Sequence, residues 1–559
     1  MRDLNDDISS LKSYFLNIRR VDSLFSKFVL RKIRYTHSYC LKCDKASMLR
    51  ISSHFNKLLK RFIRKPSFLF IYFILLNLLS GTVYSTPHFS FNAQVIKAYT
   101  STINLRLEEA SFYIHGIKQG DPDNLASDFI EDDIDFLKIY LSEDKSLFKL
   151  LAKNEDLRLD RLNKEMTLKS PYTLYVKAEI LLHWGLINLK FGNYLSAFTR
   201  IKKAYRLLNN NQKAYPQFSP NLKSLGVIHG MLSAVPNEVK WILKTMGGMD
   251  GDIEMAKLEL KQVLAYTDKD FIFKNEALVM YGLLISTFDN DPALARQLIF
   301  NSDLDPASSP LITFIFANLA MKTNDNDLAI QYLRDSPVSP AYFRFAYLDF
   351  MLGITKLRRL DPDAGIFFNR FIQEFNGIHF IKECYQKMAW TSLINNNDAG
   401  YLQNMQEVKT KGASVMDEDK QALREAERQV VPDIILLKAR LLSDGGYLER
   451  AEEMIKSHEY ILEDKDHALE SNYRLGRIYH LQKKYDQAIA FYIQAVDKGI
   501  DSPLHYACAS SLYIGTIYEA LKDVEKAKLY YQKCLQITAG DYSAGLHQKA
   551  KAGLNRLDK

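Results

Sequence analysis

A repeated spacing of small and bulky side chains near the C-terminus limits the possible folds of this chain more than any other feature. It occurs in residues 469–501 and recurs 39 residues later in residues 508–537. Small residues on two facing helices let the helices approach closely, and aromatic side chains then fill the space beside them. The spacing therefore predicts two antiparallel helix pairs in series. Its residues are Gly476, Tyr479, Ala488, Tyr492 and Ala495 in the first segment, and Gly515, Tyr518, Ala527, Tyr531 and Cys534 in the second.

This spacing resembles the tetratricopeptide repeat (TPR), a pair of antiparallel helices that stacks on its neighbours. The usual period of that repeat is about 34 residues. The extra length here is expected in the joining loop, which contains Pro503. Residues 466–540 are therefore expected to form two clear TPR units, and residues 541–559 a C-terminal capping helix.

Weaker copies of the spacing lie upstream, in residues 171–465. The chain has only 15 Pro and 24 Gly in 559 residues, which favours helix throughout. We expect an all-α protein, a TPR-like α-solenoid of stacked antiparallel helix pairs, with divergent repeats at 171–465 and a helical region at 86–170. The matching positions are Trp184, Gly185, Tyr194, Ala197, Ile201 and Ala204, then Ala317, Ala320 and Ala329, then Ala364, Phe368 and Phe371, and then Ala439, Ala451 and Ile455.

Residues 48–85 have the pattern of a signal peptide or signal anchor. A basic flank precedes an apolar run from Phe68 to Leu79, and small residues follow before a possible cut between Ser85 and Thr86. A run this short barely spans about 30 Å of hydrocarbon, which favours a cleaved signal. A retained anchor through residues 68–79 and a buried hydrophobic helix are the alternatives. In either membrane arrangement the C-terminal body crosses the membrane.

Residues 1–47 form a basic leader that is long for a signal peptide, so Met48 is an alternative start of the product. Cys40 and Cys43 form a C-x-x-C in this leader, but no second pair of ligands follows at the spacing of a zinc site. We expect no metal site and no cofactor. The other cysteines are expected to occupy packing positions: Cys384, Cys508 and Cys534.

The net charge of +8 is concentrated at the N-terminus. Residues 1–66 carry 16 Lys and Arg against 5 Asp, whereas the rest of the chain carries 58 basic and 61 acidic side chains. A protein that binds nucleic acid carries its positive field on the folded body. The near-neutral body therefore argues against a nucleic-acid partner.

The segment GGMDGDIEMAKLEL, residues 247–260, is glycine-rich and acidic. It lacks the Lys–Ser/Thr of a phosphate-binding loop, and a calcium loop starting at Asp250 would have Lys261 in its last ligand position. We expect a turn between two helices instead. In that turn Gly247 or Gly248 adopts the left-handed conformation and Asp252 caps the next helix, whose buried face is expected to include Met255, Leu258 and Val263.

The same region resembles the Iml2-type family, which includes the fungal inclusion-body clearance proteins and the animal tetratricopeptide repeat protein 39 group. The family has a helix with a Pro, then G-F-x-G-D and an amphipathic helix. Here Pro236, Gly248, Gly251 and Asp252 match, while Met249 replaces the usual Phe. The likeness extends over roughly residues 100–555. It implies a helical-repeat protein without a known catalytic site. Because the leader is of the export type, we expect a relative from a bacterial envelope.

No sequence motif of catalysis, nucleotide binding or metal binding occurs, so we expect a protein that is not an enzyme. The acidic run at 128–146 is interpreted as the solvated face of an amphipathic helix, and the polar segment 401–429 as an exposed loop and a charged helix. Single histidines are expected to be packed or exposed rather than ligands: His183, His229, His480 and His505.

The leading functional hypothesis is a non-enzymatic scaffold of the cell envelope or secretory space, periplasmic or associated with the outer membrane if bacterial. A partner peptide or helix would bind in the concave face of the solenoid. The alternatives are a membrane-anchored or lipid-associated repeat module and an enzyme whose site is assembled across repeats. Solvent-facing residues of the first helix of each unit would select the partner: Tyr473, Arg474, Arg477, Ser511 and Thr516.

Overall fold

The computed structural model describes residues 86–164, 170–235, 248–266, 271–289, 291–458, 461, 463–538 and 543–558. The predictions for residues 1–47 and 48–85, which include the apolar run 68–79 and the Cys40–Cys43 pair, fall outside this set. No helix in the described ranges combines the length and the apolar character that crossing a membrane requires.

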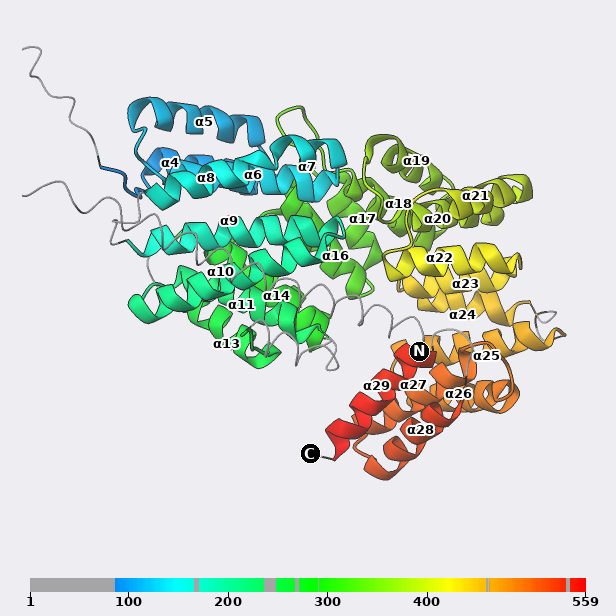
Figure 1. The fold of residues 1–559 in the computed structure, drawn as a ribbon. Helices are drawn as coiled ribbons and strands as arrows, with labels where there is room; N and C mark the ends of the chain where they lie inside the picture. The colour runs from blue at the N-terminus through cyan, green and yellow to red at the C-terminus, as the bar shows by residue number, and fades with distance from the viewer. Residues whose placement is uncertain are drawn as a thin grey trace, which may run out of the picture. The chain divides into compact units, whose positions relative to one another are not determined.

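The described residues are helical and contain no β-strand; a single bridge joins His88 and Asn124. From residue 171 onward, most helices form antiparallel pairs (Figure 1). The first helices of the pairs are α9 (Pro171–Lys190), α11 (Pro220–Ser233), α14 (Lys274–Phe288), α16 (Pro310–Lys322), α18 (Tyr347–Arg359), α20 (Ile381–Ile394), α23 (Ile434–Asp444), α25 (Lys465–Leu481) and α27 (Tyr506–Ala520). The second helices are α10 (Tyr194–Ala214), α13 (Ile253–Leu264), α15 (Pro292–Phe300), α17 (Asn326–Arg334), α19 (Ala364–Glu374), α21 (Asp398–Thr410), α24 (Leu448–Lys456), α26 (Tyr485–Gly499) and α28 (Val524–Gln536).

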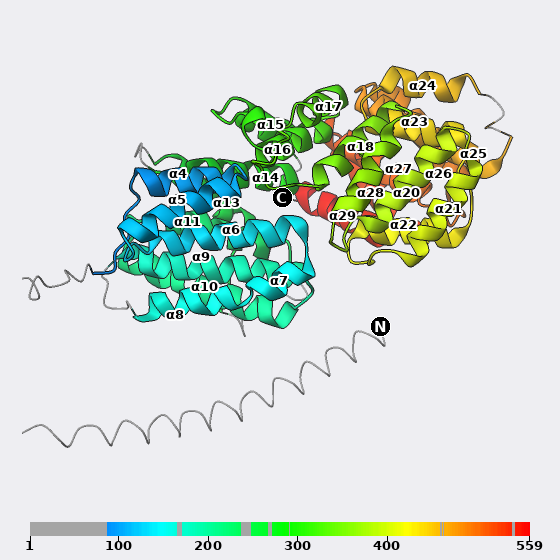
Figure 2. The same ribbon diagram turned by 90° about the horizontal axis from the view of Figure 1, so that it is seen from above.

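Each second helix also packs on the first helix of the next pair, except that α22 (Asp417–Arg428) follows α21 and lies on α20 and α21. First helices also contact one another, as in α9 with α11, α18 with α20, α23 with α25, and α25 with α27. The turned view in Figure 2 shows α9 between α6 and α10, in agreement with their contacts. The pairs therefore stack on one another, which confirms the all-α solenoid expected from the spacing. The last helix, α29 (Ser543–Leu557), packs on α27 and α28.

The two C-terminal pairs nest through glycine, as the spacing predicts. A Cβ atom at Gly476 would lie 2.5 Å from Tyr492 Cδ1, and one at Gly515 would lie 2.7 Å from Tyr531 Cδ1. Both tyrosines are buried. The same separation of sixteen residues recurs in α9 and α10, where a Cβ atom at Gly185 would lie 2.7 Å from Ile201 Cγ1. In three further pairs a small first-helix residue stands sixteen residues before a large second-helix residue: Ala317 and Leu333, Ala389 and Met405, and Ala439 and Ile455.

Two aromatic residues assigned to this packing differ from the prediction. Tyr194 is 63% exposed, because it begins α10 and its side chain lies off the face that meets α9. Tyr518 is only half-buried and stacks on Tyr530 within its own pair. The remaining packing positions are buried: Trp184, Gly185, Ala197, Ala204, Gly476, Tyr479, Ala488, Tyr492, Ala495, Gly515, Ala527, Tyr531 and Cys534.

The glycine-rich segment forms the predicted turn. Gly248 has a φ of +63°, and the Asp252 side chain accepts a hydrogen bond of 2.9 Å from the backbone N–H of Met255, capping α13. A Cβ atom at Gly251 would lie 2.2 Å from the His229 ring, so this position requires glycine. The predicted buried face of α13 was partly wrong: Val263 is buried with Ala256 and Leu260, whereas Met255 and Leu258 are exposed, because α13 packs on α11 and α14 through the former set.

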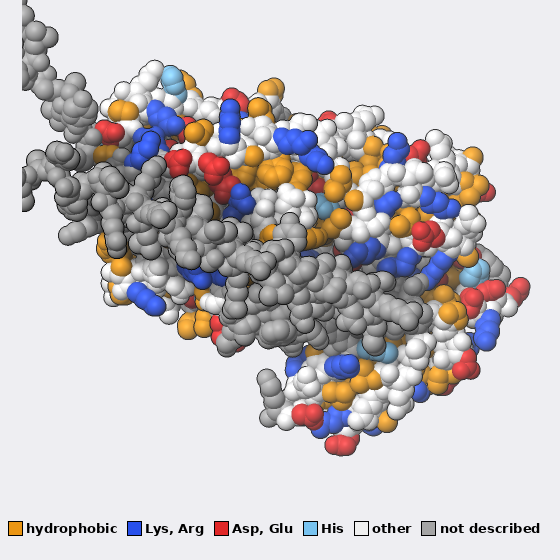
Figure 3. Space-filling model, viewed as in Figure 1, with side chains coloured by type: hydrophobic (Ala, Val, Ile, Leu, Met, Phe, Trp, Pro, Cys, Tyr) orange, Lys and Arg blue, Asp and Glu red, His pale blue; other side chains and the backbone are white. Residues whose placement is uncertain are grey.

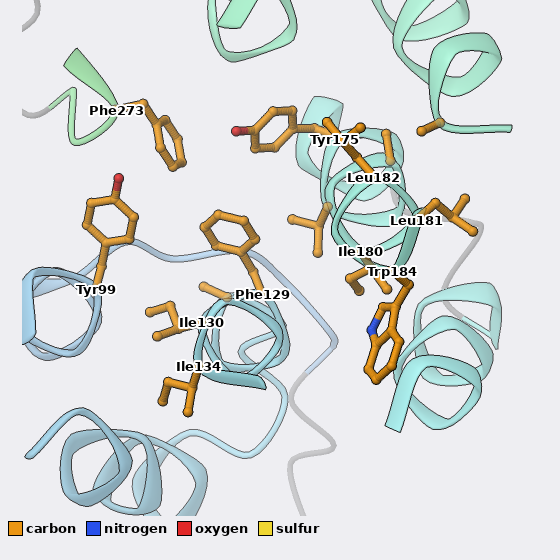
Figure 4. Packing of buried hydrophobic residues seen from close by; sticks show 14 of the residues in the cluster. Tyr99, Phe129, Ile130, Ile134, Tyr175, Ile180, Leu181, Leu182, Trp184 and Phe273 are labelled. Atoms are coloured by element: carbon orange, nitrogen blue, oxygen red, sulfur yellow. The ribbon is translucent and has the colours of Figure 1, made fainter. Parts of the chain in front are cut away.

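The N-terminal helices lie against the repeats instead of continuing the stack. They are α4 (Ala93–Ile103), α5 (Leu107–Gly120), α6 (Ala126–Ser142), α7 (Lys145–Leu151) and α8 (Lys153–Lys164). In Figure 4 the rings of Tyr99 from α4, Phe129 from α6, Tyr175 from α9 and Phe273 before α14 point toward one another. All four rings are buried, and those of Tyr99 and Phe273 meet edge to face at 5.6 Å. One core thus joins α4 and α6 to the first helices.

Candidate partner-binding site

The face formed by the first helices is the surface that the sequence assigns to a partner. In the N-terminal repeats the chain's own helices cover it. The Tyr99 hydroxyl of α4 donates to Glu276 of α14 at 2.5 Å, and the backbone N–H of Phe343, ahead of α18, donates to the Leu105 carbonyl at 2.6 Å. Farther along, Glu143 after α6 accepts from Lys190 of α9 at 2.9 Å and lies 2.7 Å from His379 Nδ1. This part of the face is therefore not open to a partner.

The acidic run on α6 is not the solvated face that we predicted. The carboxylates of Asp128, Asp132 and Asp135 are buried. Asp132 accepts from Trp184 Nε1 at 3.0 Å and lies 2.9 Å from His183 Nδ1, and Arg158 of α8 donates to Asp132 and Asp135. Since α6 is enclosed between α9 on one side and α5 and α8 on the other, its polar face meets protein, and Asp128, Asp132 and Asp135 each pair with an arginine of α8.

A second buried group of titratable side chains joins α9, α11 and α14. Lys223 Nζ lies 2.7 Å from Glu179 and 2.8 Å from Glu276, and Ser224 donates to Glu179 at 2.5 Å. Burial lowers the pKa of Lys223, but the two carboxylates outweigh that effect and raise it. Lys223 is 4% exposed, so this group works as an internal tie between helices.

A charged cleft of 490 Å³ lies between α5, α6 and α8. Three of its cations are paired with acids that line it: Lys118 with Glu131 at 2.6 Å, Arg158 with Asp135 at 2.7 Å and Arg161 with Asp128 at 3.1 Å. Lys138 pairs with Glu108 of α5 at 3.8 Å. Among the described residues no three His, Cys, Asp or Glu side chains are placed to hold a metal ion. The cleft therefore offers fixed, neutralised charges rather than a nucleophile beside a base.

We expect the stability of the N-terminal half to fall as the pH rises from about 6.5 to 9. Burial lowers the pKa of His183, but the hydrogen bond to Asp132 and the charges of Asp132 and Asp133 raise it to about 9. A folded-state pKa above the unfolded value of about 6.5 gives stability that is present below pH 6.5 and lost toward pH 9, up to about 3 kcal/mol. Urea unfolding at several pH values measures this, and His183→Gln should flatten the dependence; a slope unchanged by that variant would contradict the assignment.

In the C-terminal repeats three of the five predicted partner residues come together on α25. Arg477 lies over the Tyr513 ring of α27 at 4.3 Å, and the Tyr473 ring lies 5.1 Å from that of Tyr506. Arg474 pairs with Glu470 at 2.6 Å. The result is a cluster of aromatic rings and guanidinium groups that spans two consecutive first helices.

A tetratricopeptide repeat model matches residues 467–540, the stretch that contains this cluster. This part of the chain consists of tetratricopeptide repeats. A solved structure with similar features is the crystal structure of the APC/C hetero-tetramer Cut9–Hcn1, at 13% identity, 82% coverage of this chain, 97% coverage of that chain and a TM-score of 0.23. No curated protein sequence matches the chain significantly.

The other two predicted residues of the TPR units lie elsewhere. Ser511 is fully buried, because the N-terminal half of α27 is enclosed on every side, so the prediction that it faces solvent was wrong. Tyr473 is also buried, at 8% exposure, within its aromatic neighbours. Thr516 is exposed as predicted, and its hydroxyl donates to the Leu512 carbonyl at 3.0 Å.

Two histidines in the TPR units are neutral at pH 7. Burial lowers the pKa of His480 to about 4 with help from Arg477, and burial lowers the pKa of His505 to about 4 with help from Arg474. Arginine is therefore the source of positive charge in this cluster. On the face drawn in Figure 3, Lys and Arg side chains stand among Asp, Glu and hydrophobic ones.

Sequence analysis missed the part of this surface that lies upstream of the TPR units. Two cations lie over the ring of Trp390 in α20. Lys387 Nζ is 3.9 Å from the ring centroid, and the guanidinium of Arg440 in α23 is 4.8 Å from it. Its indole N–H donates to Glu425 of α22 at 2.7 Å. The signal was present in the sequence, since Lys387 and Arg474 each stand two residues before the small residue of their pair.

The cysteines of the described part of the chain occupy packing positions. Cys384, Cys508 and Cys534 are free thiols and fully buried. The sulfur atoms of Cys508 and Cys534 are 3.5 Å apart, where α27 meets α28. Cys534 takes the place that Ala495 has in the preceding unit.

Proposed function

We propose that this protein is a non-enzymatic scaffold that holds a peptide or helix of a partner protein on the first-helix face of its C-terminal repeats. The observation that carries the proposal is the cluster on α25 and α27, in which Arg477 and Tyr513 stand on that face of the matched TPR units. Arginine and tyrosine give large, directional contacts at protein interfaces. The N-terminal part of the face is already filled by α4 and α6, so a partner has the C-terminal part available.

A photo-crosslinking amino acid placed on either side of the TPR units tests this proposal. At Thr516, which is exposed on the first helix α27, it should give a covalent adduct with a partner protein in cell extracts. At Leu529, which is 58% exposed on the second helix α28, it should not. Equal adducts at the two positions, or none at either, would contradict a partner site on the first-helix face.

The proposal includes a place of action in the cell envelope or secretory space, based on the signal-like pattern of residues 48–85. A mature chain that begins near Thr86 would support a cleaved signal, and a membrane-bound chain that retains residues 68–79 would support an anchor. A mature chain that begins at Met1 and is recovered without membranes would exclude both. Membership of the Iml2-type group is proposed on the turn at Gly248–Asp252 and on the order of the helices around it.

A further inference from the structure

Two acidic helices of this chain, α6 and α22, pack on the first helices α9 and α20. Their contacts show which side-chain groups the first-helix face binds. On α9, the carboxylate of Asp132 from α6 is held by His183 and by the indole N–H of Trp184. On α20, the carboxylate of Glu425 from α22 accepts from the indole N–H of Trp390 at 2.7 Å and from Gln386 at 2.5 Å. In both cases a tryptophan and a neighbouring polar side chain of a first helix hold a carboxylate of a helix packed on it.

The cations on these first helices share one register. His183 stands two residues before Gly185, Lys387 two before Ala389, and Arg474 two before Gly476. Each is preceded by a glutamate four residues earlier. Lys387 pairs with Glu383 at 3.5 Å, and Arg474 pairs with Glu470 at 2.6 Å. On α9 this position is His183, which holds Asp132 of α6. The equivalent residues of α20 and α25, Lys387 and Arg474, are cations as well.

On α23 and α25 the positive charge exceeds what the neighbouring acids neutralise. Arg477 makes no ion pair with any described residue, and neither does Arg358 of α18, although both are partly buried. Among the described residues, the one ion pair of Arg440 is with Asp444, at 3.9 Å. Burial lowers the pKa of Arg358, while Asp444 and Glu383 oppose that effect and Arg440 adds to it. Arg477 lies over the Tyr513 ring and is hydrogen-bonded to Tyr492, so its charge is held in place without being neutralised and can pair with a carboxylate of a partner.

We infer that the first-helix face of α23, α25 and α27 binds an acidic amphipathic helix of a partner protein, as α9 binds α6 and α20 binds α22 within this chain. Its carboxylates meet Arg440 and Arg477, and its apolar side meets the half-buried ring of Tyr513, which Tyr473 supports from beneath. A helix is favoured because both internal examples are helices whose carboxylates accept from first-helix side chains. This inference rests on the proposed function and adds the chemistry of the partner.

The test uses the full chain and a fluorescein-labelled peptide with the sequence of residues 126–143, an acidic amphipathic helix, followed by fluorescence anisotropy. The control peptide has every Asp and Glu replaced by Asn and Gln. We expect the acidic peptide to bind, and added salt to weaken binding. Arg477→Glu should weaken binding at least about tenfold, a change of about 1.4 kcal/mol. Arg477→Lys, which keeps the charge, should stay within about threefold of the wild type.

A matched variant separates this site from general charge effects. Arg450→Glu changes the same charge on the exposed side of the second helix α24 and should leave the dissociation constant within about twofold. Equal binding of the two peptides, equal loss in Arg450→Glu and Arg477→Glu, or displacement of the peptide by single-stranded RNA would overturn the inference.

The outcome can be told apart from failure of the proposed function. A partner that crosslinks at Thr516 but whose binding is unchanged by Arg477→Glu would leave the scaffold in place and remove the acidic helix. A circular dichroism melt of each variant shows whether it folds. If Arg477→Glu does not fold, the comparison of the acidic and neutral peptides on the unaltered chain still decides whether the carboxylates are recognised.

Discussion

Gly476→Val should destabilise the C-terminal repeats by about 3 kcal/mol, through overpacking of the space that the Tyr492 ring fills. A single Cβ atom at Gly476 would already lie 2.5 Å from Tyr492 Cδ1 and 2.7 Å from Cε1, and an aromatic ring has no flexible end that can move away. Because the ring is fully buried between α25 and α26, a shift of the ring would also disturb the next pair. Hydrogen exchange of the α25 and α26 amides measures the effect as a lower free energy of local opening.

Gly116→Ala provides the control for that variant. Gly116 lies within α5, and a Cβ atom there meets nothing within 4 Å. Replacing glycine by alanine in an open helical position should therefore stabilise the helix, by up to about 1 kcal/mol. Destabilisation of both variants to the same extent would show that helix interiors, and not the nesting of the pair, set the cost.

Asp132→Ala should destabilise the N-terminal half by about 3 to 5 kcal/mol and loosen α6 from α9. The carboxylate is fully buried and is approached by His183 Nδ1, Trp184 Nε1 and Arg158 Nη1 within 3.3 Å. Its removal leaves a buried guanidinium and a buried indole N–H short of an acceptor. Thermal unfolding and hydrogen exchange of α6 and α9 measure the loss.

The matched control is Glu108→Ala, which removes an acid from the neighbouring helix α5. Glu108 is 85% exposed and its only ion pair among the described residues is with Lys138 at 3.8 Å, so the expected change is within about 0.5 kcal/mol. A loss from Asp132→Ala no larger than that from Glu108→Ala would mean that α6 is held on α9 by its apolar contacts alone.

The helix pairs could be predicted from the sequence because their packing is local. Gly476 and Tyr492 are separated by a fixed distance along the chain, so the contact appears as a spacing that the next pair repeats at Gly515 and Tyr531. The cap at Asp252 and the left-handed Gly248 were predictable for the same reason, since each depends on residues within one turn.

The covering of the first-helix face by α4 and α6 could not be predicted. It depends on contacts between distant residues, such as Asp132 with Trp184 and Glu143 with His379. A helix with apolar residues on one side and acids on the other has the pattern of a surface helix, and nothing local shows that a second wall of protein meets the acids. Ser511 was misplaced in the same way, because burial of α27 on all sides comes from neighbouring helices.

The nesting of the pairs can be examined by a double-mutant cycle on Gly476 and Tyr492, measured as the free energy of unfolding. Gly476→Val and Tyr492→Ala each destabilise the chain, but the valine enters the space that the missing ring leaves. We expect the double variant to be more stable than the sum of the two losses by at least about 1 kcal/mol, and Gly476→Val with Tyr531→Ala to be close to additive. Additivity in the Gly476 and Tyr492 cycle would contradict the account of the stack given above.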